Sequence, residues 1–193
     1  MDEYNKILNP LKAEELLIRA SQIGFDASCD ILTGNFLRLL VASRKQINIL
    51  ELGTGVGHST AWILEGMDES SKLYSVEMNE ECSSIAKEIL GNDQRLELIV
   101  CDGAEYIMEH ANRRFDIIFA DTWPGKFYLL EEVLKMVKSG GIYIIDDLNP
   151  QPNWPEGHGE KVKELITYLE SRDDFFISKL NWSTGLILMT RKV

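Results

Sequence analysis

The stretch Ile49-Leu-Glu-Leu-Gly-Thr-Gly-Val-Gly-His-Ser-Thr60 decides the fold, because it joins an apolar run to a helical pattern through three alternating glycines. Glycines at such a junction let the backbone turn sharply and let a ligand approach without a Cβ atom in the way. Dinucleotide sites typically read GxGxxG and seat a pyrophosphate on the helix N-terminus. Here the third glycine comes one position earlier, which favours S-adenosylmethionine, a ligand without phosphate. The alternative is an ordinary strand-to-helix turn.

Acidic residues follow the two strands predicted after this turn. Glu77 ends the first of them about 20 residues past the turn, where a carboxylate can accept hydrogen bonds from both ribose hydroxyls. The alternative for Glu77 is a solvated acid at a strand end. Asp102 either meets the adenine amine or caps the helix that follows it. The residues expected to bind S-adenosylmethionine are Glu51, Gly53, Thr54, Gly55, Gly57, Ser59, Glu77, Met78, Asp102, Gly103, Ala104 and Asp121.

Short apolar runs alternate with helical stretches on the C-terminal side of the turn. Strands are expected at 47–52, 72–77, 97–101, 115–120, 142–146, 175–180 and 185–190. Helices are expected at 60–65, 80–90, 104–111, 127–137 and 160–172. This alternation predicts right-handed crossovers and a parallel sheet with helices on both faces. Residues 181–184 are too few for a helical crossover, so the last two strands should pair antiparallel. The fold class is therefore α/β, with a Rossmann-like seven-stranded sheet that is mostly parallel and has an antiparallel C-terminal strand.

Two further helices are predicted before the turn, one ending near Gly24 and one starting near Asp30. No linker divides the 193 residues, so we expect one domain. In it, the helices within residues 1–45 contribute to a substrate pocket, and residues 46–193 form the cofactor-binding core.

The formal net charge of −11 disfavours nucleic acids and anionic membranes as partners. Proteins that bind nucleic acid or anionic membranes cluster Lys and Arg, which are scattered here. A small-molecule substrate is therefore expected. Three features of the sequence predict a cytoplasmic protein. The three cysteines show no pairing pattern, the polar N-terminus is unlike a signal peptide, and no apolar run is long enough to span a membrane.

Together, these motifs resemble the class I S-adenosylmethionine-dependent methyltransferases. Within them, the chain is most similar to the small O-methyltransferases related to catechol and caffeoyl-CoA O-methyltransferases, over nearly its whole length from Gly34. The motif ELGTGVGHST is specific for the superfamily. The assignment to the O-methyltransferase branch depends on weaker motifs. The resemblance implies methyl transfer to a hydroxyl of a small acceptor, and it implies a possible homodimer because the family often dimerises.

Those weaker motifs are acids at two strand ends. In the family, an Asp at the first end and an Asp-Asn pair at the second hold a divalent cation, usually Mg²⁺. Carried over, the possible metal ligands are Asp121, Asp146 and Asp147, with Asp147 standing where the family has Asn. Such oxygen ligands suit Mg²⁺, which would acidify the acceptor hydroxyl. The alternative is that one of these acids caps a helix or meets the amino group of S-adenosylmethionine.

The family also places a lysine, a candidate base, three residues after the first metal ligand. Here that position is Pro124. Lys126 lies nearby and either reaches the same space or stays on the surface, and we favour the surface position.

The loop at residues 149–158 contains three of the five prolines and is therefore expected to be stiff. Trp154 is expected as a wall of the substrate pocket, and His158 is either a general base or, as we favour, structural or solvated. The candidate catalytic residues are thus Asp121, Lys126 and His158. His58 is expected to pack beside the cofactor and His110 to lie at the surface.

Two alternatives to an O-methyltransferase stay open. One is a metal-independent N- or carboxyl-methyltransferase, and the other is a protein that binds S-adenosylmethionine without catalysis. The altered lysine position and Asp147 give the second alternative some weight. A nicotinamide dehydrogenase ranks last because the glycine spacing is wrong for it.

Overall fold

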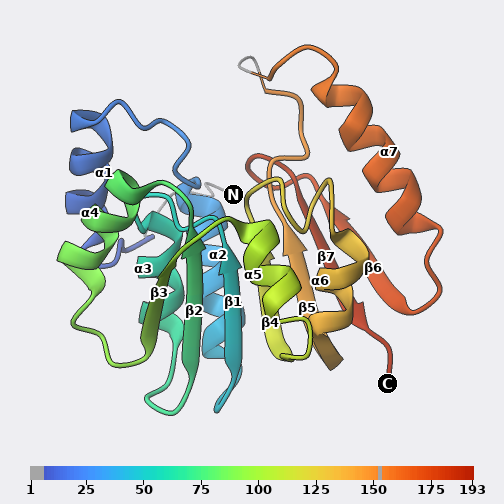
Figure 1. The fold of residues 1–193 in the computed structure, drawn as a ribbon, viewed down its shortest axis with the longest axis horizontal. Helices are drawn as coiled ribbons and strands as arrows, with labels where there is room; N and C mark the ends of the chain where they lie inside the picture. Colours follow the sequence, from blue (N-terminus) through green and yellow to red (C-terminus); the bar gives the residue numbers. More distant parts are fainter. Residues whose placement is uncertain (1–6, 152–153) are drawn as a thin grey trace.

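The computed structural model describes residues 7–151 and 154–193, and across these residues seven strands form a single sheet (Figure 1). Their order is β3-β2-β1-β4-β5-β7-β6. The strands β1 to β5 run parallel, and β7 lies antiparallel between β5 and β6. The strands are β1 (Asn48–Leu52), β2 (Lys72–Glu77), β3 (Leu96–Val100), β4 (Phe115–Ala120), β5 (Val137–Ile145), β6 (Phe175–Leu180) and β7 (Leu186–Arg191). The predicted α/β fold with an antiparallel C-terminal strand pair is confirmed.

Helices cover both faces of the sheet, and each face has its own hydrophobic core (Figure 1). The helices are α1 (Ala13–Gln22), α2 (Ile31–Ala42), α3 (His58–Gly66), α4 (Glu80–Leu90), α5 (Gly103–Glu109), α6 (Leu130–Met136) and α7 (His158–Glu170). Apolar residues of α1 to α4 pack in one core, and those of α5 to α7 pack in the other. None of the helices within the described ranges is both long and apolar enough to cross a lipid bilayer.

The central strands supply side chains to both cores because successive residues of a strand point to opposite faces. In β4, Ile117 and Phe119 belong to the core beside α1 to α4, whereas Ile118 and Ala120 belong to the other. All four are at most 1% exposed. This two-sided burial explains why the strand reads as an unbroken apolar run instead of an alternating one.

Two elements differ from the sequence-based prediction. β5 begins at Val137, five residues before the expected start, and its pairing with β4 shifts register between Phe115 and Ile117. The helix expected from residue 127 begins only at Leu130. The preceding residues fold into a turn in which Gly125 N–H donates to the carbonyl of Tyr128 over 2.8 Å, so they are not free to continue the helix.

The site is positioned by the point where the strand order reverses. From β1 the chain proceeds outward to β2 and β3, and it then returns to the other side of β1 to form β4 and β5. In open α/β sheets, ligands bind at the carboxyl ends of the strands beside such a reversal. The glycine turn after β1 and the acids after β4 and β5 all lie at this edge.

Candidate functional site

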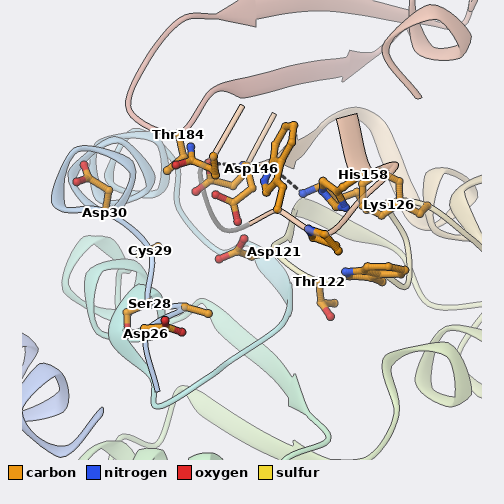
Figure 2. Close-up of a pocket in the computed structure, with 17 residues that line it drawn as sticks. Asp26, Ser28, Cys29, Asp30, Asp121, Thr122, Lys126, Asp146, His158 and Thr184 are labelled. Carbon is orange, nitrogen blue, oxygen red and sulfur yellow. Dashed lines mark hydrogen bonds between the residues drawn. The ribbon is translucent and has the colours of Figure 1, made fainter. Parts of the chain in front are cut away.

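Three adjoining cavities line the carboxyl edge of the sheet. The β2 cavity, of about 230 Å³, lies against Gly103, Tyr128 and the end of β2. The turn cavity, of about 210 Å³, lies over the glycine turn. The acid cavity, of about 390 Å³, lies beyond the ends of β4 and β5 (Figure 2). The β2 and turn cavities share Gly53, Glu77, Met78 and Thr122. The turn and acid cavities share Ala27, Ser28, Cys29, Asp121 and Thr122, so the three form one continuous row.

The glycine turn depends on backbone conformations that side chains rarely allow. The φ angles of Gly53, Gly55 and Gly57 are +98°, +53° and +97°. A Cβ on Gly53 would lie 2.9 Å from the carbonyl oxygen of Asp121, and a Cβ on Gly55 would lie 2.9 Å from the Phe25 ring. The glycines therefore permit the turn itself and the close approach of the chain after β4.

Glu51 lies beneath the turn, fully buried, and is held by hydroxyl groups. Ser59 and Thr60 each donate to its carboxylate over 2.6 Å, and Ser75 donates over 2.5 Å. Burial raises the pKa of Glu51, although these hydrogen bonds oppose the rise. Thr54 joins the network through a 2.6 Å bond to Ser75. Glu51 thus supports the turn from below, whereas Ser59 and Thr54 also line the turn cavity.

Glu77 connects the turn to the end of β2. One carboxylate oxygen accepts the N–H of Gly55 over 2.8 Å, and the other accepts the N–H of Asn79 over 2.8 Å. The side chain lines both the β2 and the turn cavity, as a ligand-facing acid must. Met78 lies on the rim and is 68% exposed.

Asp102 caps helix α5, which is one of the two roles that its position predicts. Its carboxylate accepts the N–H of Ala104 over 2.6 Å. Gly103 lines the β2 cavity, where a Cβ would lie 3.2 Å from Pro124. Asp102 and Ala104, which we expected to contact the cofactor, are not among the residues that line the three cavities.

Asp121, Asp146 and Asp147, from two strand ends, line the acid cavity. Figure 2 labels Asp121 and Asp146. Burial raises the pKa of Asp121 well above its ordinary value, and the charges of Asp146 and Asp147 raise it further. Burial also raises the pKa of Asp146 to about 6, although bonds from Thr184 Oγ1 and from the Asp147 N–H favour the charged form. The cavity therefore concentrates negative charge that its own hydrogen bonds only partly stabilise.

Lys126 is buried, so the surface position that we favoured from the sequence is wrong. Its side chain is 4% exposed, and Nζ donates to the carbonyl oxygen of Asp146 over 2.5 Å (Figure 2). The reason is the tight loop after β4, in which the N–H groups of Lys126 and Phe127 both donate to the carbonyl of Trp123. Burial lowers the pKa of Lys126, and the nearby acids, Asp121 foremost, oppose that change.

His158 lies at the N-terminus of α7 among aromatic rings. Its ring centroid is 5.9 Å from that of Trp123, 5.1 Å from Phe127 and 4.6 Å from Trp154. His158 is 7% exposed, and its Nδ1 has no hydrogen-bond partner among the described residues. Burial lowers its pKa, and the charges of Lys126 and Lys161 lower it further. The histidine is therefore not solvated, and Trp154 lines the acid cavity as expected. Pro152 and Asn153, which belong to the predicted stiff loop, lie outside the described residues.

The two other histidines lie at the turn cavity and at the end of α5. His58 is 3% exposed and lines the turn cavity, with its Nδ1 3.0 Å from the carbonyl oxygen of Cys29. His110 is half-buried at the end of α5, where its ring stacks on Tyr106.

The acids of the cavity do not form a metal site in this arrangement. Within residues 7–151 and 154–193, no three His, Cys, Asp or Glu side chains come together in a way that could hold a metal ion. The Asp146 carboxylate is engaged by Thr184 and by the Asp147 N–H. Metal ligation by Asp121, Asp146 and Asp147 stays a prediction.

Sequence reasoning expected residues 1–45 to contribute to the substrate pocket, but it named none of the individual residues that form one wall of the row of cavities. The segment from Phe25 to Asp30, between α1 and α2, lines both the turn and the acid cavity. No pattern in these residues indicates such a role, because the tertiary structure alone brings them over the sheet edge. Thr184, from the turn between β6 and β7, was missed for the same reason. Thr122 and Trp123 could have been found, since they directly follow the β4 acid.

The chain is similar in sequence to several named proteins. The chain is 23% identical over 175 residues to the Tapetum-specific methyltransferase 1 of Arabidopsis thaliana, which covers 82% of the chain and 75% of that relative. The chain spans 45% of the length of a Mycolicibacterium vanbaalenii relative and 64% of that of a Mycobacterium avium relative.

Solved structures share the fold over nearly the whole chain. An O-methyltransferase from Bacillus cereus in complex with SAH superposes with a TM-score of 0.83 at 21% identity, covering 97% of this chain and 94% of that one. The O-methyltransferase TomG from Streptomyces achromogenes, in complex with SAM, superposes with a TM-score of 0.83 at 19% identity, covering 98% and 93%. The sequence model of the O-methyltransferase family matches residues 10–167. The chain therefore belongs to the O-methyltransferase family.

Proposed function

We propose that the protein transfers the methyl group of S-adenosylmethionine to a hydroxyl of a small-molecule acceptor. The observation that carries this proposal is the continuous row of three cavities along the sheet edge. A row of this kind holds a long ligand at one end and a second molecule at the other. Asp121 lies where the turn and acid cavities meet, so it marks the position of the reaction. Family membership and the relatives that bind SAM or SAH support the same assignment.

S-adenosylmethionine, when bound, supplies a methyl group on a sulfonium, which is a good leaving group. The chain's residues hold this ligand by shape and by hydrogen bonds. In the proposed mode, the β2 cavity takes the adenine beside Gly103, and Glu77 accepts hydrogen bonds from the ribose. The turn cavity takes the amino-acid portion against Gly53, Gly55 and the neighbouring Thr54. Gly57 and Glu51 act from outside these cavities by shaping the turn.

The residues of the acid cavity orient the acceptor and move its proton. Alignment of the acceptor oxygen with the methyl carbon is the main requirement, because a correctly positioned pair reacts far faster than a free one. Lys126 is the best candidate for the base, since burial favours its neutral amine. Asp121, whose raised pKa makes its carboxylate more basic, is the second candidate. His158 borders the same cavity and orients the acceptor from the α7 side.

The remaining expectations belong to this proposal. The protein acts in the cytoplasm on a small molecule and not on nucleic acid, in keeping with its net charge of −11. It is a single domain in which residues 1–45 complete the substrate pocket around the 46–193 core, and the lining segment before α2 supports this. Two copies form a homodimer, which sedimentation would test.

The test is a binding titration followed by a turnover assay. SAH and S-adenosylmethionine are titrated into the protein by calorimetry, and we expect both to bind with one site per chain. Methyl transfer from labelled S-adenosylmethionine to a panel of phenols is then measured, with Gly55→Val as the inactive control. Absence of binding by either ligand contradicts the proposal. Binding without transfer to any acceptor supports a non-catalytic protein instead.

Addition of EDTA separates a metal-assisted reaction from the mechanism given above. Turnover that is unchanged after dialysis against EDTA would support proton transfer by Lys126 and Asp121 without a metal. Loss of turnover that Mg²⁺ restores would contradict this and would support the metal ligation that the sequence resemblance implies.

A further inference from the structure

We propose that His58 is a positioning residue that holds the segment Phe25–Asp30 closed over the turn cavity and thereby slows both entry and release of the adenosyl ligand. We call this segment the strap. The role rests on the proposed function, because it requires that the turn cavity holds part of S-adenosylmethionine or SAH.

The strap has open space on both of its sides. On its inner side, Ala27, Ser28 and Cys29 line the turn and acid cavities. Figure 2 shows Ser28 and Cys29 across the acid cavity from His158. On the outer side, a further cavity of about 520 Å³ lies between the strap and α1, and Ser28 and Cys29 line this cavity as well. A segment with space on either side can move without displacing a packed core.

The two ends of the strap are tied to the helices that flank it. The N–H of Phe25 donates to the carbonyl of Ala20 in α1 over 2.9 Å. The carboxylate of Asp30 accepts the N–H of Leu32 over 2.7 Å and so caps α2. Between these ends, the hydroxyl of Ser28 is buried but has no partner in the described part of the chain. These bonds therefore leave the strap unattached to the cofactor-binding core at 46–193.

The ring of His58 supplies the link to that core. Its Nδ1 lies 3.0 Å from the carbonyl oxygen of Cys29 and 3.6 Å from the thiol sulfur of the same residue. Within the ranges that the structure describes, His58 is the one residue of the 46–193 core with a hydrogen bond to the strap. Because His58 directly follows Gly57, this link joins the strap to the glycine turn itself.

Trp62 fixes the tautomer of His58 that the link needs. One helical turn further along α3, its Nε1–H donates to His58 Nε2 over 3.4 Å. An indole nitrogen can only donate, so Nε2 accepts and the ring hydrogen lies on Nδ1, where it is donated to the carbonyl of Cys29. Burial lowers the pKa of His58, although the bond to Cys29 and the charge of Asp30 oppose the change, and the neutral ring matches this arrangement.

The link acts as a latch on the kinetics of binding. The strap is already closed in the ligand-free structure, since the His58 bond is formed there. A ligand must therefore wait for the bond to open before it enters the turn cavity, and again before it leaves. A hydrogen bond of ordinary strength changes such an opening equilibrium about two- to tenfold. Because entry and release are slowed alike, the affinity depends on the latch far less than the rates do.

Two substitutions of His58 test the latch. His58→Asn places an amide nitrogen near the position of Nδ1 and keeps the donor, whereas His58→Gln places its polar group near Nε2 and loses the donor. Stopped-flow tryptophan fluorescence measures association and dissociation of SAH. We expect both rates to rise at least about threefold in His58→Gln, with a Kd changed less than about twofold, and to stay near wild type in His58→Asn. Unchanged rates in His58→Gln, equal effects in the two variants, or weaker binding without faster association overturn the proposal.

A variant that leaves His58 in place gives an independent test. Trp62→Phe removes the N–H that fixes the tautomer, so both SAH rates should rise at least about twofold. Circular dichroism checks the fold of each variant. Unchanged rates in folded Trp62→Phe contradict the role given to the tautomer.

Alkylation of Cys29 reports opening of the strap without any ligand. Iodoacetamide is added to the ligand-free protein, and mass spectrometry follows each cysteine separately. Cys29 should react at least about threefold faster in His58→Gln than in wild type, whereas Cys101, a half-buried cysteine after β3, should not change. His58→Asn also lacks the imidazole, so it controls for a direct effect of the ring on the thiol. Equal alkylation of Cys29 in all three proteins overturns the latch.

The two measurements separate this inference from the proposed function. If SAH fails to bind the wild-type protein, the proposed function fails, and the alkylation rates still show whether His58 holds the strap. If SAH binds but the rates of the variants equal those of wild type, only the latch was wrongly inferred.

Discussion

The two halves of the functional cleft differ in how their carboxylates are stabilised. In the cofactor half, Glu51 accepts hydrogen bonds from three hydroxyls, and Glu77 accepts them from two backbone amides. In the acceptor half, no described residue donates to the carboxylate of Asp121, and Asp146 and Asp147 stand beside it. The pKa of Asp121 is correspondingly raised well above its ordinary value.

This difference indicates the function of each half. A fully hydrogen-bonded network holds one geometry, which suits a ligand that every reaction shares. A carboxylate that has no donor and lies beside other carboxylates, as Asp121 does, is costly unless a proton or a cation joins it. The acceptor half therefore keeps unfavourable repulsion between its carboxylates. Binding of the substrate, or proton exchange with Lys126, can relieve this repulsion.

The largest expected effect is a loss of SAH binding in a variant that alters only the cofactor half. In Gly55→Val, a side chain enters the space beside Phe25 at a backbone φ of +53°, so SAH affinity should fall at least about 100-fold. Gly140→Val is the control, because Gly140 has φ +71° but nothing within 4 Å of its Cβ position. Calorimetry measures the affinity, and circular dichroism checks the fold. Unchanged affinity in Gly55→Val would remove the turn from the site.

A second variant alters only the acceptor half and should lower turnover. Lys126→Met fills the buried space but removes the amine, so kcat should fall about 100-fold or more. The affinity for SAH should change by less than about threefold, since a neutral side chain of similar size adds no clash to the turn cavity. Lys163→Met serves as control, because Lys163 is a surface residue of α7 with a side chain 72% exposed. Equal losses of turnover and SAH affinity would contradict the separation of the two halves.

The pH dependence of stability sharpens the comparison. The pKa of Asp146 is raised to about 6, so the folded state binds a proton more tightly than the unfolded chain does. The contribution of Asp146 to the free energy of unfolding should therefore fall as the pH rises from about 4 to about 6. In Asp146→Asn this loss disappears, and the variant should be more stable than wild type by about 2 kcal/mol at pH 7.

Urea denaturation of both proteins at pH 4 and pH 7 measures this difference. Asp173→Asn, which changes an exposed acid, should show no such pH-dependent gain. A variant less stable than wild type at pH 7 would mean that the ionised Asp146 stabilises the fold through Thr184, contrary to the raised pKa.

The smallest effect concerns the helix cap beside the β2 cavity. Asp102→Ala removes the acceptor for the Ala104 N–H and should lower the free energy of unfolding by about 1 kcal/mol. Asp102→Asn keeps a capping oxygen and should cost less. Thermal denaturation compares the two. A large loss of SAH affinity in Asp102→Asn, with stability retained, would instead favour a direct contact to adenine.

The cofactor half could be predicted because its residues are close in sequence. The strand, the glycine turn and the helix after it form one continuous segment, and Glu77 ends the next strand along the chain. Steric rules for positive φ and the alternation of strands with helices were sufficient there. The antiparallel pairing of β6 and β7 was also predictable, because a short loop cannot carry a crossover.

The acceptor half was decided by tertiary structure. Lys126 points inward because a tight loop turns it toward Asp146, and nothing in its sequence neighbourhood distinguishes it from a surface lysine. Ser28 and Thr184 are separated from Asp121 by 93 and 63 residues, yet they line the same cavity. Local sequence patterns reflect local backbone preferences, whereas the charge and burial of a cavity arise only when distant segments are packed around it.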